Sequence, residues 1–243
     1  MLIIRPKIFA HRGASRYAPE NTFPAFELAY ELGADGIELD VQLSKDQIPV
    51  IIHDENLRRT TNGSGFVQDY TFEELSQFDA GSWFSKHYQS TKIPSLEQFL
   101  RWVEPKNLIV NIELKTNVLE YQGIEEIIDG LINQFNLSDR TIVSSFNDAT
   151  IRNLRNINED LTLAWLTKKR WRDITQLLKD IGANDIHIKS TLLPSGMRKS
   201  IQEHEIPFRV YTVNRPITMR KCWQLGADGI VTDVPDIAKK TLQ

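Results

Sequence analysis

Three carboxylates in the chain have the types and spacing of a cation site. Glu38 and Asp40 stand two residues apart in "DGIELD", and Glu113 lies in "NIELK". Side chains alternate across a strand, so Glu38 and Asp40 share one face. Converging buried acids are costly unless a cation neutralises them. Three acids without a cysteine favour all-oxygen binding of Mg²⁺ or Ca²⁺ over zinc, and the alternative is a salt-bridged layer with Arg12 and Lys115.

Two histidines end apolar runs that lie near these acids in the sequence. His11 and His53 are each followed by a residue that could serve the site, Arg12 in "HRG" and Asp54 in "HD". A pair of imidazoles can give and take a proton near neutral pH. Arg12 adds a planar fork suited to phosphate oxygens, and Lys115 adds a second cation. Together with a divalent metal, this set suits phosphoryl chemistry. We expect the remaining histidines to be structural: His87, His187 and His204.

The elements that must position these residues alternate between strand and helix. Helical patterns follow eight strand-like runs: KIFAH (7–11), GIELDV (36–41), LIVNIELK (108–115), TIVSSF (141–146), LTLAWL (161–166), DIHIK (185–189), FRVYTV (208–213) and GIVTD (229–233). Such alternation predicts a parallel sheet, and eight units in ~250 residues predict a (β/α)₈ TIM barrel. A doubly wound open sheet is the rival, but no glycine-rich phosphate loop supports it. The carboxyl ends of barrel strands form the face where barrel enzymes place their sites.

One segment departs from this alternation. A strand-like run returns after "LSKDQI" with no helix between, which requires antiparallel pairing. A turn at Asp46–Gln47 would place Asp40 opposite His53. The Gly- and Ser-containing region 54–94, with one short helix, is expected to be a loop insertion over the barrel mouth. We therefore predict one catalytic domain over residues 1–243.

Several helix starts have recognisable caps. Asn21 or Thr22 can cap the first helix, and Ser95 stands three residues before Gln98. The segment "LGADGIELD" returns near the end as "LGADGIVTD", with valine in place of the glutamate. We interpret both copies as helix-to-strand joints, with the glutamate added for the site. Asp233 is predicted to cap the last helix.

Composition restricts the remaining classes of function. A net charge of −3 and a pI of about 6.0 give no global positive field for nucleic acid. One cysteine, Cys222, excludes an intrachain disulfide and a cysteine metal cluster. No apolar run approaches the ~20 residues of a membrane span. The start "MLIIRPKIFAHRG" lacks the pattern of a signal peptide, so a cytoplasmic location is expected, with no stable membrane anchor.

The long opening motif is the most specific feature of the sequence. "HRGASRYAPENTFPAFELAYELGADGIELDVQLSKDQIPVIIHD" resembles the opening of the glycerophosphodiester phosphodiesterases of compact bacterial type. The resemblance continues through "LRRTTNGSG", "IPSLEQFL", "NIELK", "YTVN" and "GADGIVTDVP". It implies a metal-dependent barrel that cleaves glycerophosphodiesters, such as glycerophosphocholine or glycerophosphoethanolamine, to sn-glycerol 3-phosphate and an alcohol. The implied partner is a small-molecule substrate.

The resemblance also implies roles by position. His11 and His53 would form the acid–base pair; we favour His11 as base and His53 as acid, but the sequence leaves the order open. The metal ligands would be Glu38, Asp40 and Glu113, and the phosphate would be bound by Arg12 and Lys115. Glu20 and Tyr211 would support the site or contact the glycerol. Tyr211 stands where many members have tryptophan. Two routes stay open: direct attack by water, or prior attack by the glycerol 2-hydroxyl to form a cyclic phosphate.

Two rival functions are compatible with the same barrel. A lysophospholipase D or a phosphoinositide-type phospholipase would need an apolar surface at the mouth, for which the loop offers Phe66, Trp83, Phe84 and Tyr88. A catalytically silent barrel would be expected to lack a site residue, and none is missing. The sequence leaves open the oligomeric state, the alcohol head group and the choice between the two metals.

Overall fold

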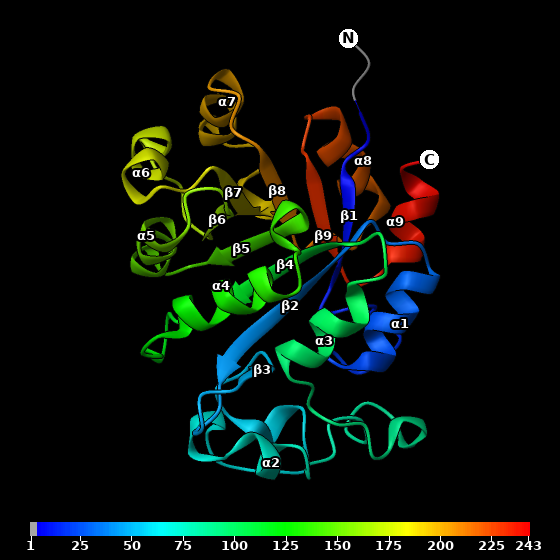
Figure 1. The fold of residues 1–243 in the computed structure, drawn as a ribbon. Coiled ribbons are helices and arrows are strands. Elements are labelled where there is room, and N and C mark those ends of the chain that lie inside the picture. The colour runs from blue at the N-terminus through cyan, green and yellow to red at the C-terminus, as the bar shows by residue number, and fades with distance from the viewer. Residues whose placement is uncertain (1–3) are drawn as a thin grey trace.

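The protein is a closed parallel β-barrel surrounded by helices (Figure 1). The computed structural model describes residues 4–243. The parallel strands follow the order β1-β9-β8-β7-β6-β5-β4-β2, and pairing of β1 with β2 closes the ring. They are β1 (Lys7–His11), β2 (Gly36–Leu43), β4 (Ile109–Leu114), β5 (Thr141–Ser145), β6 (Thr162–Thr167), β7 (Asp185–Lys189), β8 (Phe208–Tyr211) and β9 (Gly229–Thr232). The predicted TIM barrel is confirmed.

The helices cover the outside of the barrel because each one presents an apolar stripe to the strands. In α3, buried Leu96, Phe99, Leu100 and Val103 recur with the helical period. Figure 1 shows the helices as an outer layer around the sheet. The outer helices are α1 (Phe23–Glu31), α3 (Leu96–Val103), α4 (Ile124–Gln134), α5 (Asp148–Ile157), α6 (Ile174–Ile181), α7 (Gly196–Glu203), α8 (Pro216–Gln224) and α9 (Pro235–Thr241).

Alternation along the strands separates the helix-facing core from the barrel interior. Ile37, Leu39 and Val41 of β2 belong to the large core under the helices, which leaves Glu38 and Asp40 for the interior. The interior contains a separate apolar layer made by Phe9, Ile142, Ala164 and Val231. The valine that replaces glutamate in the second copy of the repeated segment therefore fills the barrel, as the sequence predicts.

The hairpin after β2 is one residue out of the predicted register. β3 (Pro49–Ile51) pairs antiparallel with β2 so that Val41 lies opposite Ile51. Asp40 is thus level with Ile52, whose N–H donates to the Asp40 carbonyl at 3.0 Å. The predicted pairing of Asp40 with His53 is wrong. The cause is a three-residue loop, in which Gln47 takes the left-handed conformation with φ of 60°.

The segment 54–94 has a small core of its own. It contains η1 (Leu57–Arg59), η2 (Val67–Asp69), α2 (Phe72–Leu75) and η3 (Lys86–Tyr88), so its single short α-helix is as predicted. Val50 and Ile52 from the hairpin pack there with apolar side chains of the segment. Figure 1 places this part of the chain beside β3, at the far end of the long β2 strand. The hairpin therefore connects the insertion to the barrel.

Helix starts follow the sequence in part. Ser95 and Gln98 form the predicted capping box of α3. Thr22 occupies the N-cap position of α1, but its hydroxyl donates to the Pro19 carbonyl at 2.6 Å and makes no cap bond.

His187 is buried inside the barrel, and burial lowers the pKa of its imidazole to about 3, so the ring is neutral. Within residues 4–243, no helix has the length and apolar character that a membrane crossing requires.

Candidate active site

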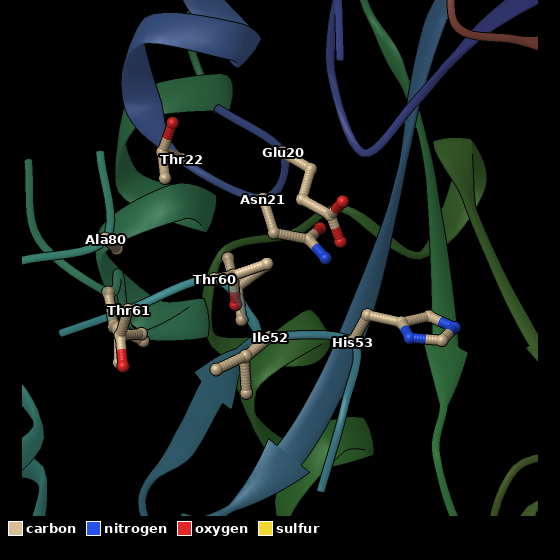
Figure 2. A pocket seen from close by; sticks show the side chains of 10 residues that line it. Glu20, Asn21, Thr22, Ile52, His53, Thr60, Thr61 and Ala80 are labelled. Carbon is tan, nitrogen blue, oxygen red and sulfur yellow. The ribbon is translucent and has the colours of Figure 1, made fainter. Parts of the chain in front are cut away.

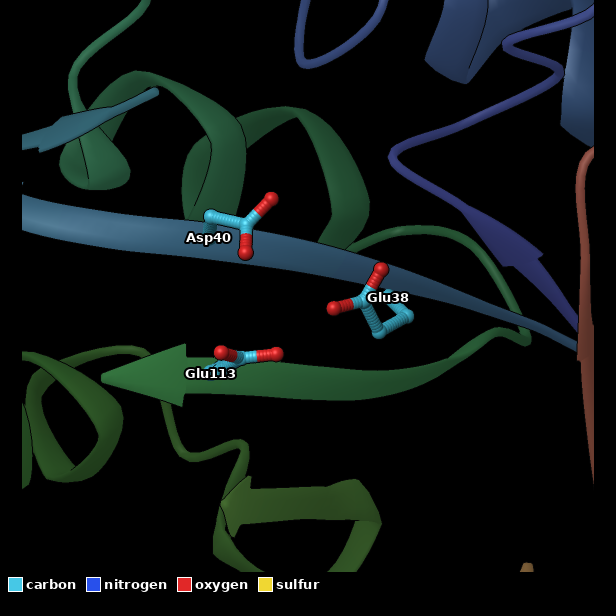
Figure 3. A group of neighbouring side chains, drawn as sticks. All are labelled: Glu38, Asp40 and Glu113. Atoms are coloured by element: carbon cyan, nitrogen blue, oxygen red, sulfur yellow. The ribbon is translucent and has the colours of Figure 1, made fainter. Parts of the chain in front are cut away.

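The three predicted acids converge where the long strand β2 passes the carboxyl end of β4 (Figure 3). Asp40 and Glu113 are register partners on these neighbouring strands, and Glu38 precedes Asp40 by two residues on the same face. One oxygen of each carboxylate lies within 4.8 Å of one oxygen of the other two. The side chains are almost completely buried, with exposures of 4%, 1% and 7% for Glu38, Asp40 and Glu113. Such a group needs neutralising charge.

Two cationic side chains supply part of that charge. Lys115 places its Nζ 2.8 Å from Glu113 Oε1 and 3.6 Å from Asp40 Oδ1. Arg12 places its Nε 3.0 Å from Asp40 Oδ2, to which Asn21 also donates a hydrogen bond. Burial by itself raises the pKa of Asp40, but the charges of Arg12 and Lys115 hold it below its usual range. Asp40 is therefore ionised in the folded protein.

Glu38 is the acid left without a cationic partner. Among residues 4–243 it forms no ion pair, and its Oε2 accepts only the Arg12 N–H at 3.1 Å. Burial and the charge of Asp40 raise the pKa of Glu38 to about 8, against the opposing effect of His11. A hard divalent cation would relieve this repulsion, because all the available donors are oxygens. Glu38, Asp40 and Glu113 thus fit such an ion.

His11 ends β1 beside this cluster, and an aspartate holds its ring. The Nδ1 atom lies 2.6 Å from Asp233 Oδ1. Asp233 also accepts from Asn214 Nδ2 at 2.5 Å and from Ser15 Oγ at 3.3 Å. Burial lowers the pKa of His11, but the bond to Asp233 and the charge of Glu38 outweigh it, so the net shift is upward. The predicted cap is wrong: α9 begins after Val234, and the Asp233 carboxylate points to His11 instead.

His53 has an aspartate of its own, from the next position in the chain. Its Nδ1 lies 2.5 Å from Asp54 Oδ1. Arg59 donates from Nε to Asp54 Oδ2 at 2.5 Å and binds both oxygens of Glu20 at 2.8 Å. Glu20 in turn accepts from Arg12 Nη1 at 2.7 Å. Arg59 therefore joins the carboxylate that holds His53 to the carboxylate that holds Arg12.

A small cavity lies beside this ionic chain (Figure 2). Glu20 and Asn21 line it from the loop before α1, and His53 and Ile52 line it from the hairpin. Figure 2 shows the imidazole of His53 directed away from the apolar side chains. Glu20 thus contacts both Arg12 and Arg59, and its predicted part in the site stays a prediction.

Tyr211 closes the opposite part of the mouth, at the end of β8. Its hydroxyl donates to the Thr167 carbonyl at 3.0 Å, and its ring meets the Phe146 ring edge to face at 6.1 Å between centroids. Burial and the charge of Glu113 raise the pKa of the Tyr211 hydroxyl. These contacts hold the Tyr211 side chain in place at the end of β8, and its predicted role in the site stays a prediction.

The structure also adds Arg59 and Asn214, to which the sequence assigned no part in the site. Asp54 was noted only as a residue beside His53 that could serve the site, and Asp233 was given a different role. A signal for Asp233 was available: Val231 faces the interior, and the residue two positions later must face the same way. Nothing comparable marks Arg59, because it lies in an irregular segment.

Comparison with known proteins agrees with this geometry. The Glycerophosphoryl diester phosphodiesterase family matches residues 11–237. Glycerophosphodiester phosphodiesterases from Bacillus altitudinis and from Caldanaerobacter subterraneus are 41% and 38% identical, over 96% and 94% of this chain and 97% and 94% of their own. The structure is similar to an Oleispira antarctica phosphodiesterase in complex with the product sn-glycerol-3-phosphate, with a TM-score of 0.89 and 28% identity over 98% of this chain and 96% of that one. The chain belongs to the glycerophosphodiester phosphodiesterase family and is an enzyme that hydrolyses glycerophosphodiesters.

Proposed function

We propose that the enzyme releases sn-glycerol 3-phosphate and a free alcohol from diesters such as glycerophosphocholine and glycerophosphoethanolamine, with Mg²⁺ or Ca²⁺ as cofactor. The observation that best supports this is the pair of histidine–aspartate contacts, at 2.6 Å and 2.5 Å, beside one buried acidic cluster. The bound product named for the Oleispira enzyme supports the same reaction. Residues 1–243 act as one catalytic domain, and the cytoplasmic location remains a prediction from the sequence.

The metal would be held by Glu38, Asp40 and Glu113. When bound, a divalent cation supplies neutralisation and orientation of the phosphate oxygens. Arg12 and Lys115 stand next to the same carboxylates and offer N–H donors to the other phosphate oxygens. Their fixed positions mean that little reorganisation is needed when negative charge develops on the phosphoryl oxygens.

The two histidines would move the protons. Each Nδ1 faces a carboxylate that can only accept, so each Nδ1 carries a proton and each Nε2 is the working nitrogen. With a cation on Glu38, that carboxylate no longer raises the pKa of His11, whose neutral ring can accept a proton from the nucleophile. His53 would protonate the departing alkoxide, and its partner Asp54 stabilises the charged ring.

A lysophospholipase activity is the second candidate. Phe66 and Trp83 are 47% and 39% exposed on the insertion, as a surface for lipid would require. Trp83, however, packs edge to face on Phe84, which packs on Tyr88. Ring contacts of this kind fold the loop onto itself, so we prefer the soluble substrate. Turnover of micellar lysolipid without turnover of glycerophosphocholine would favour the alternative.

The test is release of glycerol 3-phosphate from glycerophosphocholine by metal-stripped enzyme, with Mg²⁺ and Ca²⁺ restored separately. We expect restoration by at least one ion, and the same experiment names the working ion. Glu38→Gln should need far more metal, because it removes the acid that has no cationic partner. Full activity in chelator, or the same metal requirement in this variant, would contradict the proposed cofactor site.

A further inference from the structure

Two lysines stand at the mouth where β6 and β7 end, apart from the strands that carry the acids. Ile186 and Ile188 of β7 pack under the helices, so Lys189 shares the inward face with His187. On β6, Ala164 faces the barrel interior, and by the same alternation Lys168, just beyond the strand end, also faces inward. In the strand order, β7 lies opposite β2 across the ring, and β6, next to β7, is separated from β4 by β5.

Contacts at the strand ends agree with this placement. Lys168 holds its Nζ 4.6 Å from the centroid of Phe146, which follows β5. Lys189 is the register partner of Tyr211, and Tyr211 meets Phe146 edge to face. Lys168, Lys189 and two aromatic rings thus form one wall.

This wall has positive charge that the described part of the chain does not neutralise. Among residues 4–243, neither Lys168 nor Lys189 forms an ion pair, and both are exposed. The loop after β6 continues with exposed Lys169, Arg170 and Arg172. The acids of the mouth are concentrated on the other side, where Arg12 and Lys115 already pair with them. The wall therefore attracts anions.

The same wall is unfavourable for a quaternary ammonium group. Aromatic faces bind such cations, but the Lys168 ammonium already lies over the face of Phe146. A choline head group on this side could not stack on the occupied face of Phe146 and would be repelled by the positive charge of Lys168. An anionic group would gain a charge-assisted contact instead.

We propose that Lys168 and Lys189 form a second anion-binding subsite, for a phosphate ester carried by the leaving alcohol of the diester. This inference rests on the proposed function and specifies its substrate class. The two lysines stand on the same rim of the barrel as the acids, so a short leaving alcohol that crosses the mouth would bring its phosphate toward these ammonium groups.

The test uses three diesters of sn-glycerol 3-phosphate with two-carbon leaving alcohols that end in a phosphate, a hydroxyl or a trimethylammonium group. We expect wild-type kcat/KM to fall in that order. Lys168→Gln with Lys189→Gln should lower the phosphate-to-hydroxyl ratio of kcat/KM by about tenfold. Lys179→Gln, an exposed lysine on α6, is the matched control and should leave the ratio unchanged. Added salt should lower the wild-type ratio by screening.

Other outcomes separate the alternatives. An unchanged ratio in the double variant, or an equal loss on both substrates, would overturn the subsite. Sedimentation with phosphatidylglycerol vesicles that the double variant abolishes, combined with an unchanged ratio, would assign the wall to a lipid surface instead. Absence of turnover of all three diesters by folded wild-type enzyme with metal would overturn the proposed function itself, and the subsite with it.

Discussion

The two histidines are held in the same way by two different parts of the molecule. His11 meets Asp233 at 2.6 Å, and both residues end barrel strands or follow them directly. His53 meets Asp54 at 2.5 Å, and both lie beyond the end of the hairpin strand β3. One pair is thus fixed by the barrel, whereas the other depends on the inserted segment. Mutations of neighbouring residues can therefore affect the two histidines differently, although both make the same contact with an aspartate.

The partners of the two aspartates show this difference. Asp233 receives neutral donors from Asn214 and Ser15, and its own N–H donates to Asn214 Oδ1 at 2.9 Å. Asp54 receives a charged donor, Arg59, whose side chain is 43% exposed and also binds Glu20. A change near Asp233 should remain local. A change at Arg59 should reach both His53 and Arg12.

The largest effect should come from removing the rings themselves. His11→Ala and His53→Ala should each lower kcat/KM on glycerophosphocholine by about 10³-fold with the fold retained, because a positioned acid or base contributes roughly 10²–10⁴. A diester with 4-nitrophenol as leaving group needs no proton on departure. His53→Ala should regain most of its activity on that substrate, whereas His11→Ala should not.

Circular dichroism and the unfolding midpoint are the controls for these variants. Regain of activity by His11→Ala in place of His53→Ala would reverse the assignment of base and acid. Full activity of either alanine variant on glycerophosphocholine would exclude that histidine from proton transfer. The two histidine–aspartate pairs would then differ in structure without a corresponding difference in proton transfer.

A smaller effect should come from neutralising the aspartates. Asp233→Asn should lower kcat by about 10²-fold, because the amide no longer selects the Nδ1-protonated ring. It should also shift the acidic limb of the pH–rate profile to lower pH, since Asp233 is one of the groups that raise the pKa of His11. Asp54→Asn should cost less, about tenfold, because the His53 ring is more exposed than the His11 ring, at 31% against 21%, and water can replace part of the lost contact. Equal losses in both variants would remove the distinction between the two regions.

The barrel and most of the site follow from periodic features of the sequence. Strand alternation in "GIELDV" and "LIVNIELK" suffices to place Glu38, Asp40 and Glu113 on the inner face, because one face must be apolar to pack under the helices. The strand ends then bring Lys115 and His11 to the same rim. Alternation is a reliable guide here because the apolar side chains of each strand must be buried under the helices, which decides the face that every other side chain takes.

The failures occur where no period applies. The register of the hairpin depended on the loop length, and Gln47 in a left-handed conformation allowed three residues where two were expected. Asp233 was predicted to cap the helix that follows it, because an aspartate in front of a helix can serve equally well as a cap or as the partner of a histidine, and the sequence does not distinguish the two. Arg59 bridges two carboxylates that are far from each other in the sequence, a contact that only the packed insertion determines.

The smallest effect should come from Arg59, with its neighbour Arg58 as a matched control. Arg59→Gln should lower kcat/KM by about threefold, because Asp54 and Glu20 lose their shared donor while Asp54 itself remains, and Arg59→Lys should fall between it and wild type. Arg58→Gln should have no effect, since in the described chain only the backbone N–H of Arg58 makes a bond, to Asn56. Equal activity of the variants at the two positions would contradict the bridging role.

The same variant should show a pH-dependent change in stability. Burial raises the pKa of Asp54, but the bonds from Arg59 and His53 lower it to about 2 in the folded protein. A carboxyl whose pKa is depressed by folding stabilises the protein above its unfolded value of about 3.9, and this stabilisation is lost as pH falls toward the folded value. Because the pair is partly exposed, Arg59→Gln should reduce the free energy of unfolding at pH 6 by less than about 1 kcal/mol. The difference from wild type in urea denaturation should shrink at pH 3.5, and a gap that widens would mean that Asp54 is not ionised by this contact.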